Sequence, residues 1–136
     1  EDAELAVKHG ADAIVVSNHG GRQLDGAPSS IHALPDIVQA VGSRTEVWLD
    51  SGIRSGQDML KAWAMGARGF MTGRAFLYGL GAYGEDGAAQ RRRHVRRALE
   101  IMYNEMDITM AFTGHRNLHD VDKNILVEGT YPQPAR

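Results

Sequence analysis

Apolar residues in this chain alternate between short compact runs and longer stretches with helical spacing. The first compact run, 13–17, lacks polar alternation, which predicts a strand buried on both faces. A longer stretch puts Leu34, Ile37 and Val41 on one helical face. The predicted strands are 13–17, 46–50 and 69–72, and the predicted helices are 2–10, 31–41, 57–65, 75–80 and 88–113. A loop around Gly81, Gly84 and Gly87 and an extended end at 131–134 complete the pattern.

This order of elements predicts an α/β fold with a parallel sheet, because strands joined by crossover helices run in the same direction. The first two strands begin at residues 13 and 46, close to the ~31 residues that one unit of a (β/α)8 barrel occupies. Three strands cannot close a barrel, and an open sheet of three would have two unpaired edges. The pattern therefore leaves two possibilities, a small open α/β domain or a part of a barrel.

Polar, glycine-rich loops follow all three predicted strands, at 18–22, 50–54 and 73–74. Ligands of parallel α/β folds bind at the carboxyl ends of the strands, so these loops are expected to face the same side. Two of them suit a phosphate, because Gly52 and Gly73 allow close backbone approach while Arg54 and Arg74 offer bidentate donors. A helix N-terminus after each loop would add to this attraction. Ordinary turn glycines with solvated arginines are the alternative.

His19 ends the first strand, and Arg22 follows three residues later. A neutral imidazole is a competent general base near pH 7, and a guanidinium beside it could hold a substrate carboxylate. The other five histidines occupy helix or tail contexts, and their spacing indicates no metal site. We therefore expect no metal.

Composition excludes several classes of function. The chain has 136 residues with 15 Lys and Arg against 17 Asp and Glu, a balance unlike that of a dedicated nucleic-acid binder. It has no cysteine, which excludes disulfides and thiolate chemistry. No apolar run reaches the ~18 residues of a membrane helix. The basic cluster at 91–97 is predicted to be a solvated helix face, and the methionines at helical spacing after it to be core residues.

Three ordered motifs resemble a known family. They run from Val15 to Asp25, from Leu49 to Gly56 and from Thr72 to Tyr78, and 102–118 resembles the final helix of the same family. The family is that of FMN-dependent α-hydroxy-acid dehydrogenases and oxidases. Within it, the motif sequences are most similar to those of bacterial L-lactate dehydrogenases. The resemblance covers residues 1 to about 126.

This resemblance implies a TIM (β/α)8 barrel of which the chain is the C-terminal portion, about strands 6–8 with their helices. It implies FMN as cofactor and oxidation of an L-2-hydroxy acid. L-Lactate, oxidised to pyruvate, is the substrate we expect first. His19 would be the active-site base and Arg22 the substrate-carboxylate partner. The implied FMN-binding residues are Asp50, Ser51, Gly52, Arg54, Gly73 and Arg74. Of these, Asp50 would orient an arginine or the ribityl hydroxyls.

Further expectations follow from the resemblance. Other active-site groups of the family lie upstream of the matching segments, so residues 1–126 are expected to be part of a longer enzyme, inactive in isolation, with 127–136 as an extended tail. A quinone, a cytochrome or oxygen would accept the electrons, no nucleic acid would bind, and the full-length enzyme would be a homo-oligomer. It would be cytoplasmic or peripheral on the inner face of the plasma membrane. The alternatives are another FMN barrel enzyme, such as a type 2 isopentenyl-diphosphate isomerase, and an inactive phosphate-binding barrel fragment.

Overall fold

A computed structural model of the chain describes residues 1–82 and 88–135, with the side chains of 88–91 outside the description. Its centre is a three-stranded sheet in the order β1-β2-β3. The strands are β1 (Ala13–Val16), β2 (Glu46–Asp50) and β3 (Gly69–Met71). Both pairings are parallel, which confirms the predicted topology.

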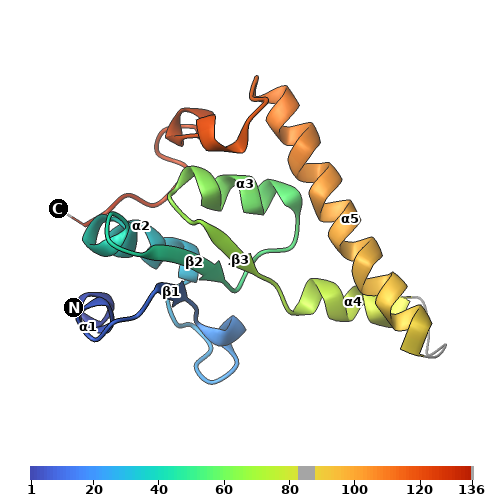
Figure 1. The fold of residues 1–136 in the computed structure, drawn as a ribbon, viewed down its shortest axis with the longest axis horizontal. Helices are drawn as coiled ribbons and strands as arrows, with labels where there is room; N and C mark the ends of the chain where they lie inside the picture. The colour runs from blue at the N-terminus through green and yellow to red at the C-terminus, as the bar shows by residue number, and fades with distance from the viewer. Residues whose placement is uncertain (83–87, 136) are drawn as a thin grey trace.

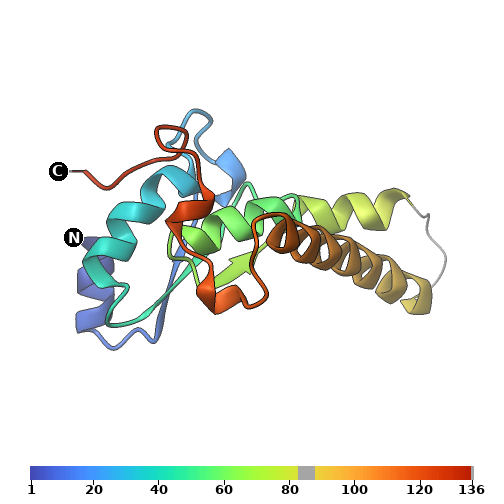
Figure 2. The ribbon, with the colours of Figure 1, turned by 90° about the horizontal axis from the view of Figure 1, so that it is seen from above.

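The described residues also form five helices, with three 3-10 turns in the loop after β1 and in the tail. Helix α5 runs along one side of the molecule, and α4 lies alongside its first part in both views (Figures 1 and 2). The two termini lie together at the opposite side. The helices are α1 (Asp2–Lys8), α2 (Ser30–Val41), α3 (Gly56–Ala64), α4 (Arg74–Ala82) and α5 (Ala88–Phe112). The 3-10 turns are His19–Gly21, Leu118–Asp120 and Lys123–Ile125.

The predicted boundaries agree with the structure to within one or two residues at most ends. The end of α4 differs, because the helix continues to Ala82 and therefore includes Gly81, which was expected in a loop. Gly84 and Gly87, the other glycines of that expected loop, lie outside the described residues.

The sheet is covered on one face only. Val16, Leu49 and Phe70 are in register across the three strands, and the first two are 6% and 1% exposed within the main core. On the other face, Val15 and Met71 are each 46% exposed. The prediction that the first strand is buried on both faces is therefore wrong for this structure, since its helices leave the second face open.

Helix α5 packs against α3 through its methionines. Met102 and Met106 are buried, and Met110 packs against the second hydrophobic cluster, which confirms these residues as core. Leu99, one turn earlier on the same expected stripe, is 52% exposed. The apolar spacing of α5 therefore becomes core only over its second half.

Both tryptophans have structural contacts, as expected. The Trp48 indole N–H donates a hydrogen bond to the Glu46 carboxylate at 2.9 Å. The Trp63 ring meets the edge of His119, with ring centroids 5.7 Å apart, and lies 4.7 Å from the Arg68 guanidinium carbon. Trp63 therefore joins α3 to the C-terminal tail.

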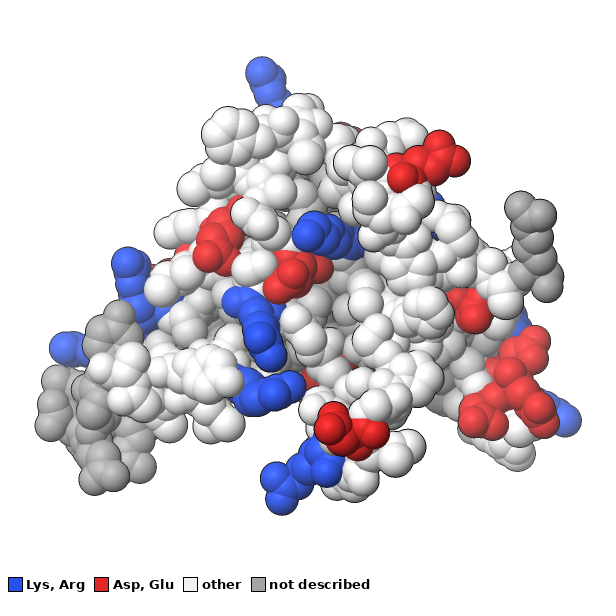
Figure 3. All heavy atoms as spheres, turned by 180° about the vertical axis from the view of Figure 1, so that it is seen from behind, with Lys and Arg blue, Asp and Glu red and all other residues white. Residues whose placement is uncertain are grey.

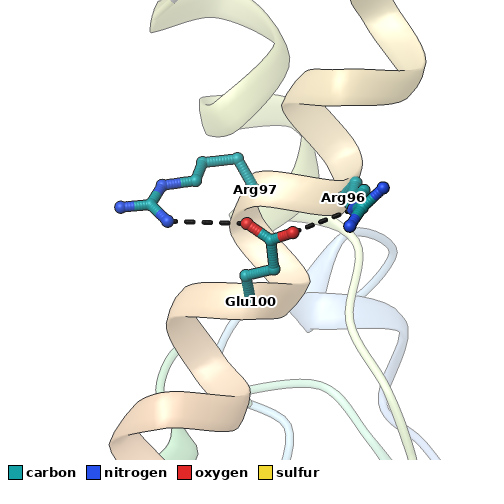
Figure 4. A network of polar contacts seen from close by, with 3 residues as sticks. All are labelled: Arg96, Arg97 and Glu100. Carbon is teal, nitrogen blue, oxygen red and sulfur yellow. Dashed lines mark hydrogen bonds and ion pairs between the residues drawn. The ribbon is translucent and has the colours of Figure 1, made fainter.

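The described arginines of the basic cluster on α5 form a solvated helix face, as predicted, whereas His94 between them is only 9% exposed. Arg92, Arg93, Arg96 and Arg97 are exposed, and the side chain of Arg91 lies outside the description. The last two contact Glu100 at 2.8 and 3.5 Å, and the hydrogen bond from Arg96 lowers the pKa of that carboxyl (Figure 4). Among the helices in the described ranges, none combines the length and apolar character needed to cross a bilayer.

Candidate active site

The loops that follow the three strands meet at one end of the sheet, around a hollow of ≈ 560 Å³. Thr72 helps to join them, because its hydroxyl donates a hydrogen bond to the Ile53 carbonyl at 2.9 Å. The expectation that these loops share one side is confirmed. All eight residues predicted for the site line this hollow: His19, Arg22, Asp50, Ser51, Gly52, Arg54, Gly73 and Arg74.

The loop that carries His19 has an unusual backbone. His19, Gly20 and Gly21 have φ angles of 54°, 68° and 72°, so three consecutive residues are in the left-handed region. Glycine adopts such angles freely, whereas a residue with a Cβ does so at a cost of about 1–2 kcal/mol. A backbone held this way at a candidate base is typical of functional sites.

Asp50 ends β2 and accepts two hydroxyl hydrogen bonds on the same oxygen, Oδ2. Ser17 Oγ donates at 2.5 Å and Ser51 Oγ at 3.0 Å. Partial burial acts to raise the pKa of Asp50, but these hydrogen bonds and the nearby His19 charge outweigh it and lower the pKa below the ordinary 3.8. No described arginine forms an ion pair with Asp50, whose Oδ2 accepts from serine hydroxyls instead. The other alternative, that Asp50 orients the ribityl hydroxyls, stays a prediction.

The N-terminus of α3 is already occupied by carboxylates from the protein itself. Asp58 Oδ2 accepts from the backbone N–H groups of Arg54 and Ser55 at 3.0 Å, and Ser55 completes a capping box. Glu105 of α5 accepts from the Gly56 N–H at 2.8 Å. The expectation that both helix N-termini attract phosphate is therefore wrong for α3, where two negative charges already satisfy the free donors.

The N-terminus of α4 is open. It has no acidic residue in its first turn, and no described side chain accepts a hydrogen bond from its first N–H groups. A Cβ placed on Gly73, just before this helix, would meet no atom within 4 Å. The Phe76 and Leu77 N–H groups donate to the Gly73 carbonyl at 3.1 and 3.2 Å, which leaves those of Arg74 and Ala75 without an acceptor among the described residues, an arrangement that suits an anion.

Three arginines with no ion-pair partner among the described residues surround the hollow: Arg22, Arg54 and Arg74, all exposed. The Arg74 guanidinium reaches the His19 loop, since a Cβ on Gly20 would lie 3.2 Å from its Nη2 atom. Elsewhere the charges are mixed, and in the view of Figure 3 basic side chains lie among acidic ones.

A second hollow, of ≈ 360 Å³, lies beside the first and shares Gly20, Ser51, Gly52, Ile53 and Arg74 with it. It adds Lys61 and Asp25 to the polar groups near the site. Within the described ranges, no group of three or more His, Asp or Glu side chains is arranged to hold a metal ion.

Sequence reasoning missed Ser17 and Asn18 as functional residues. Asn18 Oδ1 accepts from the Gly20 N–H at 3.0 Å, and Ser17 Oγ accepts from the His19 N–H at 3.0 Å. The only local signal was their position directly before a His-Gly-Gly turn, where short polar side chains commonly bond to the backbone two residues ahead.

The donors around the hollow suit a phosphate monoester. Unpaired guanidiniums, free N–H groups at α4 and two glycines without side chains provide charge, hydrogen bonds and space for it. The phosphate of FMN has this chemistry, so the residues present fit that cofactor.

Comparison with known proteins agrees with this fit. The family model of the FMN-dependent dehydrogenases matches residues 1–128. An L-lactate dehydrogenase of Caulobacter sp. (strain K31) is 49% identical over 128 residues, which cover 94% of this chain and 32% of that protein. The 2-hydroxyacid oxidase 1 of Mus musculus is 47% identical over 126 residues, 93% of this chain and 32% of that protein.

Solved structures give the same result. A mandelate oxidase with benzoyl-formic acid has a TM-score of 0.78 at 44% identity and covers 88% of this chain and 34% of its own. A flavocytochrome b2 variant with pyruvate bound has a TM-score of 0.79 at 34% identity and covers 91% of this chain and 31% of its own. The chain spans about a third of the length of the curated relatives it matches.

A parallel α/β sheet with a hollow at its carboxyl end, lined by a histidine and three arginines, is an arrangement typical of enzymes that bind phosphorylated cofactors. The chain belongs to the FMN-dependent dehydrogenase family, a family of flavoprotein oxidoreductases.

Proposed function

We propose that this chain supplies the active-site base and the cofactor-phosphate site of an FMN-dependent 2-hydroxy acid oxidoreductase, with L-lactate as its substrate and pyruvate as its product. The observation that carries the proposal is that His19 and Arg22 line the same hollow as Arg54 and Arg74. The names of the relatives support the reaction class, and the 49% identity with an L-lactate dehydrogenase favours lactate.

The fold supports a place in a (β/α)8 barrel as about strands 6–8. The sheet has unpaired edges at β1 and β3 and one open face, which further strands of a barrel would complete. Barrels frequently bind phosphate between the loops after strands 7 and 8 and the N-terminus of a short extra helix. The open start of α4, between β3 and the long α5, fits that description.

The residues that line the hollow have different roles in the chemistry. Arg22 binds the substrate carboxylate, because its guanidinium matches both carboxylate oxygens. His19 accepts a proton of the hydroxy acid, from C2 or from the hydroxyl, on an unprotonated ring nitrogen. FMN, when bound, accepts the two electrons that leave the substrate. Arg54, Arg74 and the first N–H groups of α4 neutralise the phosphate.

The proposal keeps the wider expectations for the intact protein. These are a homo-oligomer, an electron acceptor that is a quinone, a cytochrome or oxygen, and a location in the cytoplasm or on the inner face of the plasma membrane. A cytochrome is supported by the name of one structural neighbour, flavocytochrome b2.

The test uses the intact polypeptide that carries residues 1–136, saturated with FMN. It is mixed without oxygen with L-lactate, glycolate or L-mandelate, and the loss of flavin absorbance is followed by stopped flow. L-Lactate should reduce the flavin fastest, and His19→Gln should slow that step by about 100-fold or more without changing FMN affinity. His9→Gln, at an exposed position after α1, is the matched control.

Two results would contradict the proposal. One is flavin reduction by L-lactate at a near wild-type rate in His19→Gln. The other is stoichiometric FMN binding by a protein that no 2-hydroxy acid reduces, which would favour a different FMN enzyme.

A further inference from the structure

A pair of serine hydroxyls lies between the Asp50 carboxylate and the backbone of the His19 loop. Ser17 follows β1 and Ser51 follows Asp50, so the two come from neighbouring strands that end side by side. Both hydroxyls donate to Asp50 Oδ2, at 2.5 and 3.0 Å. The two serine Oγ atoms lie 3.4 Å from each other.

Each hydroxyl also accepts a backbone hydrogen bond from the loop. The His19 N–H donates to Ser17 Oγ at 3.0 Å, and the Gly20 N–H donates to Ser51 Oγ at 3.0 Å. The direction of every bond is determined by chemistry, because an ionised carboxylate can only accept. Both hydroxyl protons therefore point to Asp50, and the lone pairs are left for the two N–H groups.

The network includes two residues other than glycine whose backbone angles are unfavourable. His19 has a φ of 54°, and Ser51, which holds Gly20, has a φ of 75°. Left-handed angles are unfavourable for residues with a Cβ and persist where surrounding contacts fix them. The chain from Asp50 through the serines to the loop provides such contacts at both positions.

We propose that Asp50 is a positioning residue for His19, acting through Ser17 and Ser51 to hold the His19–Gly20 backbone in its left-handed conformation. This assignment deepens the proposed function, on which the role of His19 as base rests. It uses only Oδ2 of Asp50, so a contact between Oδ1 and a ligand is independent of it. The His19 loop then depends on a residue 31 positions away in the sequence.

The ionisation of Asp50 agrees with this arrangement. Partial burial opposes the charge, but the hydrogen bonds from Ser17 and Ser51 and the charge of His19 lower the pKa of the carboxyl. At neutral pH the carboxylate is therefore ionised and accepts from both serines.

The network predicts an order of effects. Ser17→Ala removes the one side-chain acceptor of the His19 N–H found among the described residues, whereas Ser17→Thr keeps a hydroxyl there. Ser51→Ala should loosen the loop backbone less than Ser17→Ala does, because the Gly20 N–H also donates to Asn18 Oδ1 at 3.0 Å. Asp50→Ala removes the acceptor that orients both hydroxyls. Ser43→Ala is the matched control, since Ser43 is exposed and precedes β2 at the other end of the sheet.

The direct readout is amide hydrogen exchange at His19 and Gly20, measured by NMR in the intact polypeptide. Ser17→Ala and Asp50→Ala should speed exchange at His19 by about tenfold, as expected for the loss of one hydrogen bond. Ser17→Thr should restore at least half of the protection, on a logarithmic scale, and Ser43→Ala should leave it within about twofold. Thermal melting of each variant identifies any that fail to fold, and the comparison of Ser51→Ala with Ser17→Thr then carries the test.

The second readout is the split between kcat and KM for L-lactate. In Ser17→Ala, loss of positioning should lower kcat by about tenfold or more and change KM and FMN affinity by less than about threefold, because Ser17 lies outside the phosphate loops and Arg22 is unchanged. Ser17→Thr should recover most of kcat.

The outcomes separate the two proposals. Unchanged exchange at His19 in Ser17→Ala and Asp50→Ala overturns the positioning role even if turnover falls. Faster exchange with unchanged kcat also overturns it. Faster exchange in a protein that no 2-hydroxy acid reduces supports the positioning network and overturns the proposed function.

Discussion

The backbone N–H of Gly56 donates a hydrogen bond to the carboxylate of Glu105 at 2.8 Å, across 49 residues of chain. This contact brings the first turn of α3 directly against the middle of α5, and Gly56 is buried there. A Cβ on Gly56 would overlap the backbone oxygen of Met102 and the backbone nitrogen of Met106. Only glycine allows this approach.

Gly56→Ala should therefore lower the free energy of unfolding by about 2–3 kcal/mol, because backbone atoms have to move apart. Gly81→Ala is the control, since Gly81 lies in α4 with open space around its Cβ position, and it should be neutral or stabilising by up to ~1 kcal/mol. Urea unfolding of the three proteins measures both values. Equal stability of the two variants would contradict the close packing at Gly56.

Gly73→Ala should separate cofactor affinity from stability. Gly73 has no positive φ and no atom within 4 Å of its Cβ position, so the fold should tolerate the methyl group. The methyl group would project into the hollow before α4 and should weaken FMN binding by about tenfold. Gly52→Ala should lower affinity and also cost about 1–2 kcal/mol of stability, because Gly52 has a φ of 88°. Flavin fluorescence titration and urea unfolding measure the two effects.

Arg54→Gln and Arg74→Gln should each weaken FMN binding by about 10- to 100-fold, as expected for loss of a charge-assisted hydrogen bond. Riboflavin, which lacks the phosphate, should bind each variant within about twofold of the wild type. Lysine at either position should give an intermediate FMN affinity, because it keeps the charge without the bidentate geometry. Arg92→Gln, exposed on α5, is the control. An equal loss of riboflavin affinity would contradict the assignment of these arginines to the phosphate.

Asp50 should contribute stability that depends on pH. Because its pKa is lower in the folded state than the ordinary 3.8, the contribution is present above that value and is lost as pH falls through the lowered folded pKa. The stability difference between wild type and Asp50→Asn should therefore be constant above about pH 5 and shrink below about pH 4. Urea unfolding from pH 7 to pH 3 measures it, with Asp107→Asn on α5 as the charge-matched control. A difference that grows towards low pH would reverse the sign and contradict the assignment.

Much of the fold could be predicted from the sequence, because it depends on local patterns. The β-branched run before Ser17 forms β1, and the boundaries of β2 agree at both ends. The parallel order followed from the alternation of elements. The exposure of Val15, Met71 and Leu99 could not be predicted, because it depends on which surfaces the described chain leaves uncovered.

For the candidate site too, the residues could be predicted from the sequence but their contacts could not. Strand ends, glycines and arginines placed six of the eight predicted residues and the family resemblance added Asp50 and Ser51; the hollow brings all eight together. Their hydrogen-bond partners were not predictable, because Ser17 and Asp50 are 33 residues apart in sequence yet in contact at adjacent strand ends. The same reason explains why α3 could not be excluded as a phosphate site before Glu105 was placed on it.

The sequence by itself determined the order of elements, the side of the sheet on which chemistry lies and the family, since each depends on residue type and spacing along the chain. The tertiary structure alone decided that α4 rather than α3 offers free donors to an anion, and that serines rather than an arginine hold Asp50. The physical reason is that a donor or a carboxylate is free or satisfied according to what lies within about 3 Å of it in space.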